Sequence, residues 1–168
     1  MTGIKLEFSR PLPVDRVPRG GCDEKITADH DECQALAVRL GMPKIHALSA
    51  ELLVTPWRGG GLKLEGKLMA DLEQVSVVSL EAFRQQVEFP IVRYFMAASA
   101  IKQNTDAEID PIEDGHVDLG EVVAETLALE LDPYPRRPGE AFDEIAPVQP
   151  PSLPPPSPFA SLIRLKPK

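Results

Sequence analysis

Aromatic residues are scarce in this chain of 168 residues: one tryptophan, two tyrosines and six phenylalanines make up 5% of it. A surface that stacks RNA bases therefore has few side chains to draw on. No apolar run approaches the ~20 residues that a membrane-spanning helix needs. Residues 1–7 lack a basic patch followed by an apolar stretch, so we predict no signal peptide. Two cysteines without an export signal predict reduced thiols in a cytoplasmic protein.

Positive charge is missing from one segment. Residues 104–135 hold ten acidic side chains and no lysine or arginine, whereas the formal net charge of the whole chain is -8. An acidic block repels phosphate, so the composition disfavours nucleic-acid binding across the whole surface. The block suits a basic protein partner or a divalent cation, and it is also typical of a solvated loop that keeps a protein soluble. The acidic side chains that we predict as a partner surface are Asp106, Glu108, Asp110, Glu113 and Asp114.

The N-terminal third predicts one strand, one arm and one helix. Alternating apolar and polar residues at 4–9 are typical of a half-buried strand. Residues 10–21 are rich in proline, glycine and arginine and predict an extended arm. A helix should begin at Asp29, because Asp29 and Glu32 have the spacing of a capping box, in which each side chain accepts a hydrogen bond from the other residue's backbone N–H. Thr27 is the alternative cap.

Long alternating stretches in the middle of the chain predict a β-hairpin over 48–72 with its turn at 59–61. Gly66 inside the second arm indicates a bulge or the close approach of a neighbouring backbone. We predict that extended structure continues through 75–80. The strand that follows should lie at an edge of the sheet or carry a bulge, because Pro90 has no N–H to donate.

The last third begins with residues 97–117, which predict an acidic loop. Asp118 is then expected to cap a helix, with Glu121 as its reciprocal partner. Pro133 should end that helix. Residues 140–168 are rich in proline and predict an extended, flexible tail.

These elements predict an α+β fold in one domain, residues 1–139. Its sheet should be a twisted antiparallel meander of about five strands, open or curled toward a barrel, with two helices packed on it and an extended Pro-rich C-terminal tail. Apolar residues make up 43% of the chain, which is enough for the core of one such domain.

The residues predict no catalytic, cofactor or metal site. His30 and Cys33 lie one helical turn apart, but structural zinc needs four ligands and Cys33 falls on the apolar stripe of its helix. The acidic residues of the 97–117 loop have the oxygen ligands that Mg²⁺ prefers, yet the predicted loop does not fix their positions. The glycines at 59–61 lack the lysine of a phosphate-binding loop. We therefore predict that the protein is not an enzyme and has no cofactor, small-molecule substrate or membrane contact.

A family resemblance rests mainly on the sequence DLGEVVAE at 118–125 and DPYPRRPG at 132–139. These stretches resemble the C-terminal signature of the YceD family, the large ribosomal RNA subunit accumulation proteins of bacteria and plastids. Further stretches are similar to the family's alphaproteobacterial branch, and they are 8–11, 74–81, 157–160 and 165–166. Many family members have a cysteine in the central strand motif, where this chain has VSVV at 75–78, which weakens any thiol or metal chemistry at that position.

The resemblance implies a cytoplasmic, non-enzymatic factor that 23S ribosomal RNA needs in order to be processed or to accumulate, and hence a role in large-subunit biogenesis. Its partner would be large-subunit precursor RNA, a ribosomal protein or another assembly factor. A metal-dependent RNA-processing enzyme that uses the acidic segment and an interaction adaptor unrelated to ribosomes are the alternatives.

Arginines beside an aromatic residue are typical of RNA contacts, because guanidinium groups bind phosphate in a bidentate manner and a ring stacks on a base. We predict that the N-terminal arm and the segment after the last helix form one contact surface for RNA or a ribosomal protein. An alternative is that the tyrosine packs on the sheet and the arginines pair with the acidic block. The predicted contact residues are Arg10, Arg16, Arg19, Tyr134, Arg136 and Arg137.

Overall fold

The computed structural model describes residues 6–101 and 108–140. The chain divides into two units, residues 1–137 and 138–168. Only Pro138, Gly139 and Glu140 of the second unit are described, so the predicted tail lies almost wholly outside the described residues. The following paragraphs concern the first unit.

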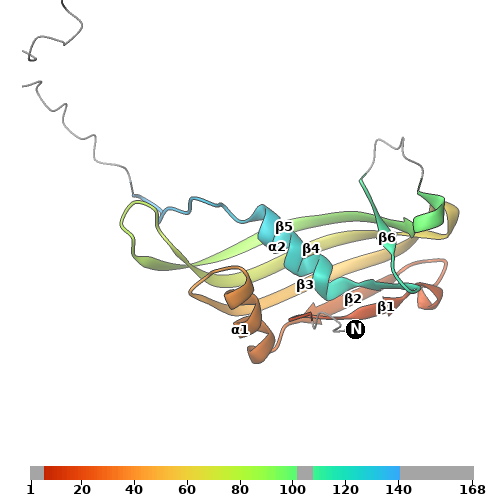
Figure 1. Cartoon of the computed structure of the whole chain (residues 1–168), viewed down its shortest axis with the longest axis horizontal. Helices are drawn as coiled ribbons and strands as arrows, with labels where there is room; N and C mark the ends of the chain where they lie inside the picture. Colours follow the sequence, from red (N-terminus) through yellow and green to blue (C-terminus); the bar gives the residue numbers. More distant parts are fainter. Residues whose placement is uncertain (1–5, 102–107, 141–168) are drawn as a thin grey trace, which may run out of the picture. The chain divides into compact units, whose positions relative to one another are not determined.

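The main sheet has five strands in the order β2-β3-β4-β5-β6 (Figure 1). Neighbouring strands are antiparallel except β5 and β6, which are parallel. Strands β2 to β5 form the predicted antiparallel meander, whereas β6 departs from it because it joins the edge of β5 in parallel. The sheet is not closed into a barrel, because β2 and β6 form its two edges. The strands are β2 (Cys22–Thr27), β3 (Lys44–Trp57), β4 (Gly61–Val75), β5 (Ala82–Ala97) and β6 (Ile109–Ile112).

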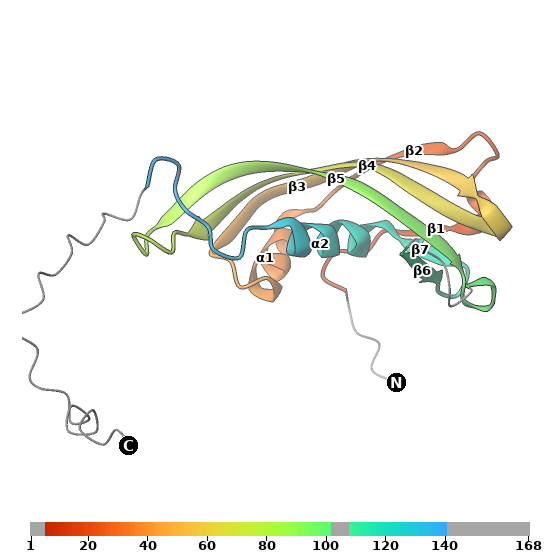
Figure 2. The same cartoon turned by 90° about the horizontal axis from the view of Figure 1, so that it is seen from above.

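Two helices, α1 (His30–Arg39) and α2 (Leu119–Glu130), lie on the same side of this arched sheet (Figure 2). Strand residues that face them are buried, whereas alternate residues on the opposite face are mostly polar. The described part of the chain therefore has one core between helices and sheet and one open sheet face. The α+β prediction is confirmed. Core side chains with the least exposure include Phe8, Leu36, Leu48, Leu64, Leu68, Leu72, Ile91, Val123 and Leu127.

The N-terminal segment forms no strand at the predicted place, at least from residue 6 onward. A short strand, β1 (Pro11–Pro13), pairs instead with β7 (His116–Asp118) in a separate two-stranded sheet. Phe8 is fully buried, so the apolar alternation correctly marked a core residue but not a strand. Its backbone packs against α2, where a Cβ added to Gly120 would lie 2.5 Å from the Phe8 carbonyl oxygen. A glycine is therefore required at the start of α2.

Two further predictions about local structure are wrong. The segment 97–117 is not one continuous loop, because it contains the short helix η3 (Ala98–Ala100), the strand β6 and the first two residues of β7. Pro111 and the acidic side chains around β6 hide that strand from an alternation pattern. Extended structure does not continue through 75–80 either, since β4 ends at Val75 and residues 77–79 form a turn.

The long hairpin is confirmed, with the short helix η2 (Arg58–Gly60) at its turn. Another short helix, η1 (Val14–Arg16), follows β1. Pro90 lies in the part of β5 that pairs with β4 alone, as expected for a residue without an N–H. Gly66 marks a close backbone approach, because an added Cβ would lie 2.0 Å from the carbonyl oxygen of Glu51.

Candidate binding surface

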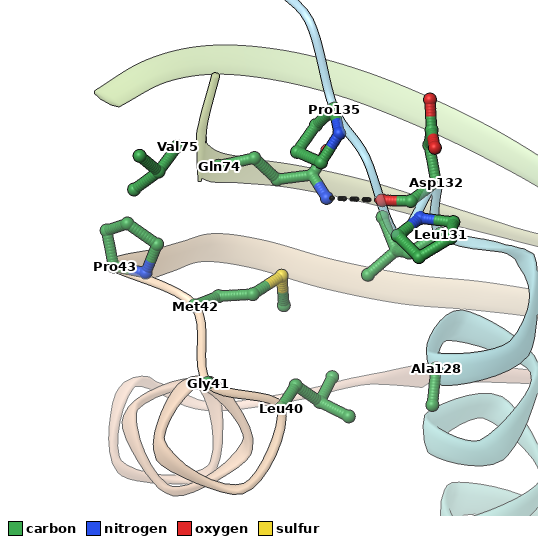
Figure 3. Close-up of a pocket in the computed structure, with 11 residues that line it drawn as sticks. Leu40, Gly41, Met42, Pro43, Gln74, Val75, Ala128, Leu131, Asp132 and Pro135 are labelled. Atoms are coloured by element: carbon green, nitrogen blue, oxygen red, sulfur yellow. Dashed lines mark hydrogen bonds between the residues drawn. The ribbon is translucent and has the colours of Figure 1, made fainter. Parts of the chain in front are cut away.

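The turn after β4 and the segment after α2 meet at one end of the sheet. The backbone N–H of Val77 donates to the carbonyl oxygen of Pro135 at 2.9 Å. Gln74 Nε2 donates to the carbonyl oxygen of Asp132 at 3.4 Å (Figure 3). Arg137 Nη2 donates to Glu81 Oε2 at 3.0 Å. We call residues 74–81 and 131–137 together the corner.

Local hydrogen bonds give each half of the corner its shape. Ser76 is fully buried, and its Oγ accepts hydrogen bonds from the backbone N–H groups of Val78 and Ser79 at 3.1 and 3.4 Å. In the second half, Asp132 Oδ1 accepts from the N–H of Tyr134 at 2.8 Å, a turn that short polar side chains favour. Both halves are therefore fixed by their own side chains as well as by each other.

Exposed apolar side chains gather on the corner. Leu80 is 78% exposed and Tyr134 is 69% exposed, and Val75 and Val77 are partly exposed beside them. Leu80 also has a φ of 60°, in the left-handed region that costs a non-glycine residue roughly 1–2 kcal/mol. Neither solvation nor backbone preference explains a leucine at this position.

An open groove of about 320 Å³ lies next to these side chains, between the ends of α1, β4 and α2 (Figure 3). Most of the side chains that line it are apolar, and among them are Leu40, Met42, Pro43, Val75, Leu131 and Pro135. The groove is large enough for one apolar side chain of a partner, which is how interface anchors are commonly buried.

The structure separates the predicted contact residues into two groups. Tyr134, Arg136 and Arg137 belong to the corner, and Arg136 is exposed. Arg16 and Arg19 are exposed at the other end of the sheet, where Gly21 packs against Val54 of β3. About 35 Å of extended strand separates the two ends, so they do not form one continuous surface.

Arg10 has a structural partner. Its guanidinium donates to both carboxylate oxygens of Glu32 at 2.7 and 2.9 Å and to the carbonyl oxygen of Thr27 at 3.1 Å. The hydrogen bond from Arg10 lowers the pKa of Glu32 below its usual value. This pair ties the N-terminal segment to α1, and an RNA contact by Arg10 stays a prediction.

The two helix starts differ in how their caps are completed. At α1, Asp29 Oδ1 accepts from the N–H of Glu32 and Glu32 Oε2 accepts from the N–H of Asp29, both at 2.8 Å, which is the predicted capping box. At α2, Asp118 accepts from the N–H groups of Gly120 and Glu121. The carboxylate of Glu121 does not reach back as predicted, because it accepts from Arg39 at 2.7 and 3.0 Å. That ion pair joins α1 to α2.

Two of the acidic side chains in this part of the chain form ion pairs with one arginine. Arg93 donates to Asp110 at 2.8 Å and to Glu125 at 3.2 Å. Glu108, Glu113 and Asp114 are exposed, and Asp106 lies outside the described residues. In residues 6–101 and 108–140, no three His, Cys, Asp or Glu side chains are grouped so that they could hold a metal ion.

The two cysteines and His30 each have surroundings of their own in the described structure. Burial is the main cause that raises the pKa of the Cys33 thiol, and it also raises that of Cys22. His30 Nε2 is 3.1 Å from Gln34 Nε2 on the exposed side of α1.

None of the helices that the structure describes is long and apolar enough to span a bilayer.

The described domain belongs to the α+β class, and residues from two of its family-like segments meet at the corner. The chain belongs to the YceD family, whose model is described as large ribosomal RNA subunit accumulation protein YceD and matches residues 64–166. The match includes both halves of the corner and excludes the similar stretch at 8–11. No curated protein matched the chain, and no solved structure did.

Sequence reasoning picked out both halves of the corner but did not predict that they touch. Their contact joins residues more than fifty positions apart through backbone groups, which leave no trace in a residue pattern. Sequence reasoning also assigned Val77 and Leu80 to extended structure, whereas both side chains are exposed, in or beside a turn. The only signal for Leu80 was that this apolar residue directly precedes the charged residue Glu81.

Proposed function

We propose that this chain supports the accumulation of large-subunit ribosomal RNA as a non-enzymatic binding factor. In this proposal the corner contacts a component of the assembling large subunit in the cytoplasm. The observation that carries the proposal is the convergence of the two family-like segments on one corner, where Val77 bonds to Pro135 and Arg137 to Glu81. Both segments lie inside the range that the family model matches.

The side chains of the corner favour a ribosomal protein as the component that it contacts directly. Tyrosine and arginine are enriched at protein interfaces and at their energetic centres, and the exposed apolar side chains beside them would be removed from water by a protein partner. The adjacent groove offers an apolar site for an anchoring side chain. RNA contact by Tyr134 and Arg136 is compatible with the same factor, but the apolar groove supports a protein partner more strongly.

The exposed acids Glu108, Glu113 and Asp114 supply a second contact for a basic protein in this proposal. They lie near β6, far from the corner along the sheet. Charge complementarity of this kind mainly raises the association rate. Binding through these acids should therefore weaken as salt increases.

Association with large-subunit precursor particles tests the proposal. The double variant Leu80→Asn with Tyr134→Ala is expected to bind about tenfold more weakly than the unchanged chain, because two interface side chains are removed. Asparagine tolerates the left-handed backbone at position 80, so the fold should be kept. Co-sedimentation of purified chain with isolated particles gives the affinity.

The matched control is Val38→Ala, which removes an exposed apolar side chain from α1, where alanine favours the helix. It should bind as the unchanged chain does. Equal binding by all three proteins would contradict a role for the corner.

A further inference from the structure

The open face of the sheet carries an aromatic pair near the β3-β4 turn, at the end opposite the corner. The rings of Trp57 and Tyr94 have centroids 4.8 Å apart and planes inclined by 48°. Trp57 is the last residue of β3, and Tyr94 lies in β5. Both rings are half-buried, so part of each remains accessible. Although aromatic residues are scarce, two of the three tryptophans and tyrosines meet here.

Two cations flank the pair. Lys63 of β4 lies directly opposite Tyr94 in the strand register, and its Nζ is 5.9 Å from the centroid of the Tyr94 ring. The guanidinium carbon of Arg58 is 5.9 Å from the centroid of the Trp57 ring. Lys63 also pairs with Glu65 at 2.7 Å, so the patch holds one carboxylate. We call Trp57, Arg58, Lys63 and Tyr94 the platform.

The strand register places the platform on the face away from the helices. Its residues alternate with the buried side chains of Leu62, Leu64 and Phe95, which face the core. In the described part of the chain α1, α2, β1 and β7 all lie on the core side (Figure 2). The platform is therefore not covered by any described element.

Glu65 is on the face of the platform, whereas two other acidic side chains near this end lie on the core side of the sheet. Asp110 and Glu125 pair with Arg93, the neighbour of Tyr94 that points toward α2. The exposed Arg16 and Arg19 belong to the same end as the platform. The platform itself thus holds two cations, Arg58 and Lys63, with one carboxylate, Glu65, beside them.

We propose that the platform binds single-stranded RNA by stacking an unpaired base on Trp57 and Tyr94, with Arg58 and Lys63 at the adjoining phosphates. Aromatic rings beside cations on an open sheet face are the features that single-strand RNA binding uses, because every base has a face that stacks. The identification of this RNA as large-subunit precursor RNA rests on the proposed function. The stacking of a base on the platform does not depend on that function. The corner and the platform would then hold protein and RNA at opposite ends of one sheet.

Trp57 is the only tryptophan of the chain, so its fluorescence reports the contact directly. The probe is a 12-nucleotide single-stranded RNA of mixed sequence, titrated into the purified full chain. We expect saturable quenching by the single strand and little quenching by the same RNA annealed to its complement. Equal quenching by the duplex would contradict base stacking, and the absence of saturable quenching would contradict RNA binding.

Tyr94→Leu keeps apolar packing but removes the ring, and it should weaken RNA binding about tenfold. The matched control is Val38→Ala, which removes an exposed apolar side chain from α1, on the side of the sheet away from the platform, and should leave RNA affinity unchanged. Equal effects of both variants would overturn the proposal. If Tyr94→Leu weakens binding of purified large-subunit proteins and not of RNA, the platform is a protein contact and the RNA assignment is wrong.

Arg58→Gln provides a second variant if Tyr94→Leu unfolds, because Arg58 is exposed at the turn. It should weaken RNA binding severalfold and reduce the slope of affinity against salt, since it removes one phosphate contact. An unchanged salt slope would contradict the contact. Normal binding of the corner variants to particles would contradict the proposed function and leave these RNA results intact, so the two proposals fail separately.

Discussion

Gly66→Ala is expected to destabilise the protein by about 3 kcal/mol, as severe overpacking does. Gly66 lies in β4 between β3 and β5, opposite Leu52 and Ile91. An added Cβ would lie 2.0 Å from the carbonyl oxygen of Glu51 and 2.9 Å from the Cα of Leu52. These are backbone atoms of a paired strand, so no side-chain rotation relieves the clash. The two strands must separate locally and lose hydrogen bonds.

Urea denaturation followed by circular dichroism measures this change. The matched control is Gly20→Ala, because a Cβ at Gly20 meets nothing within 4 Å. Gly20→Ala should be neutral or slightly stabilising, since alanine restricts the unfolded chain more than glycine does. Equal stability of the Gly66→Ala variant and the unchanged chain would show that β3 and β4 are not paired in this register.

Asp118→Ala should have the second largest effect, also about 3 kcal/mol. The carboxylate accepts from the backbone N–H of Arg10 at 2.7 Å, from the first turn of α2 at 3.0 and 3.2 Å and from the hydroxyl of Ser9. Alanine removes the helix cap and leaves the N–H of Arg10 without its acceptor. Because the same group holds the N-terminal segment on α2, both the helix start and that segment should loosen together.

Thermal unfolding and amide hydrogen exchange at residues 8–12 measure the two parts of this effect. Asp118→Asn should cost less than alanine, because asparagine also caps helices. Glu113→Ala removes an exposed carboxylate five residues earlier and serves as the matched control. If Asp118→Ala is no less stable than Glu113→Ala, the cap does not join the two segments.

The sequence predicted those elements whose defining residues lie within one short stretch of the chain. The capping box of Asp29 and Glu32 needs only three residues of spacing, and the β3-β4 hairpin follows from alternation around a glycine turn. Gly66 was likewise identified from its place inside a strand. In each case the partners are close in sequence or the constraint lies in one residue type.

Contacts between distant residues were not predictable in the same way. Pairing of β1 with β7 joins residues about 105 positions apart, and both prolines of β1 weaken its strand signal. Trp57 and Tyr94 meet only because β3, β4 and β5 have one particular register, which a count of aromatic residues does not contain. The corner depends likewise on a bond between the backbone groups of Val77 and Pro135.

The ratio of 23S to 16S ribosomal RNA after depletion of this protein tests the central claim most directly. After depletion, the cells that normally produce this protein should regain the normal ratio when they are supplied with the unchanged chain or with the Val38→Ala variant. Cells supplied with Leu80→Asn and Tyr134→Ala should keep a low ratio and accumulate unprocessed precursor ends, although the variant protein is present at normal amounts. A normal ratio in depleted cells, or full rescue by the corner variant, would contradict a function exerted by binding through the corner.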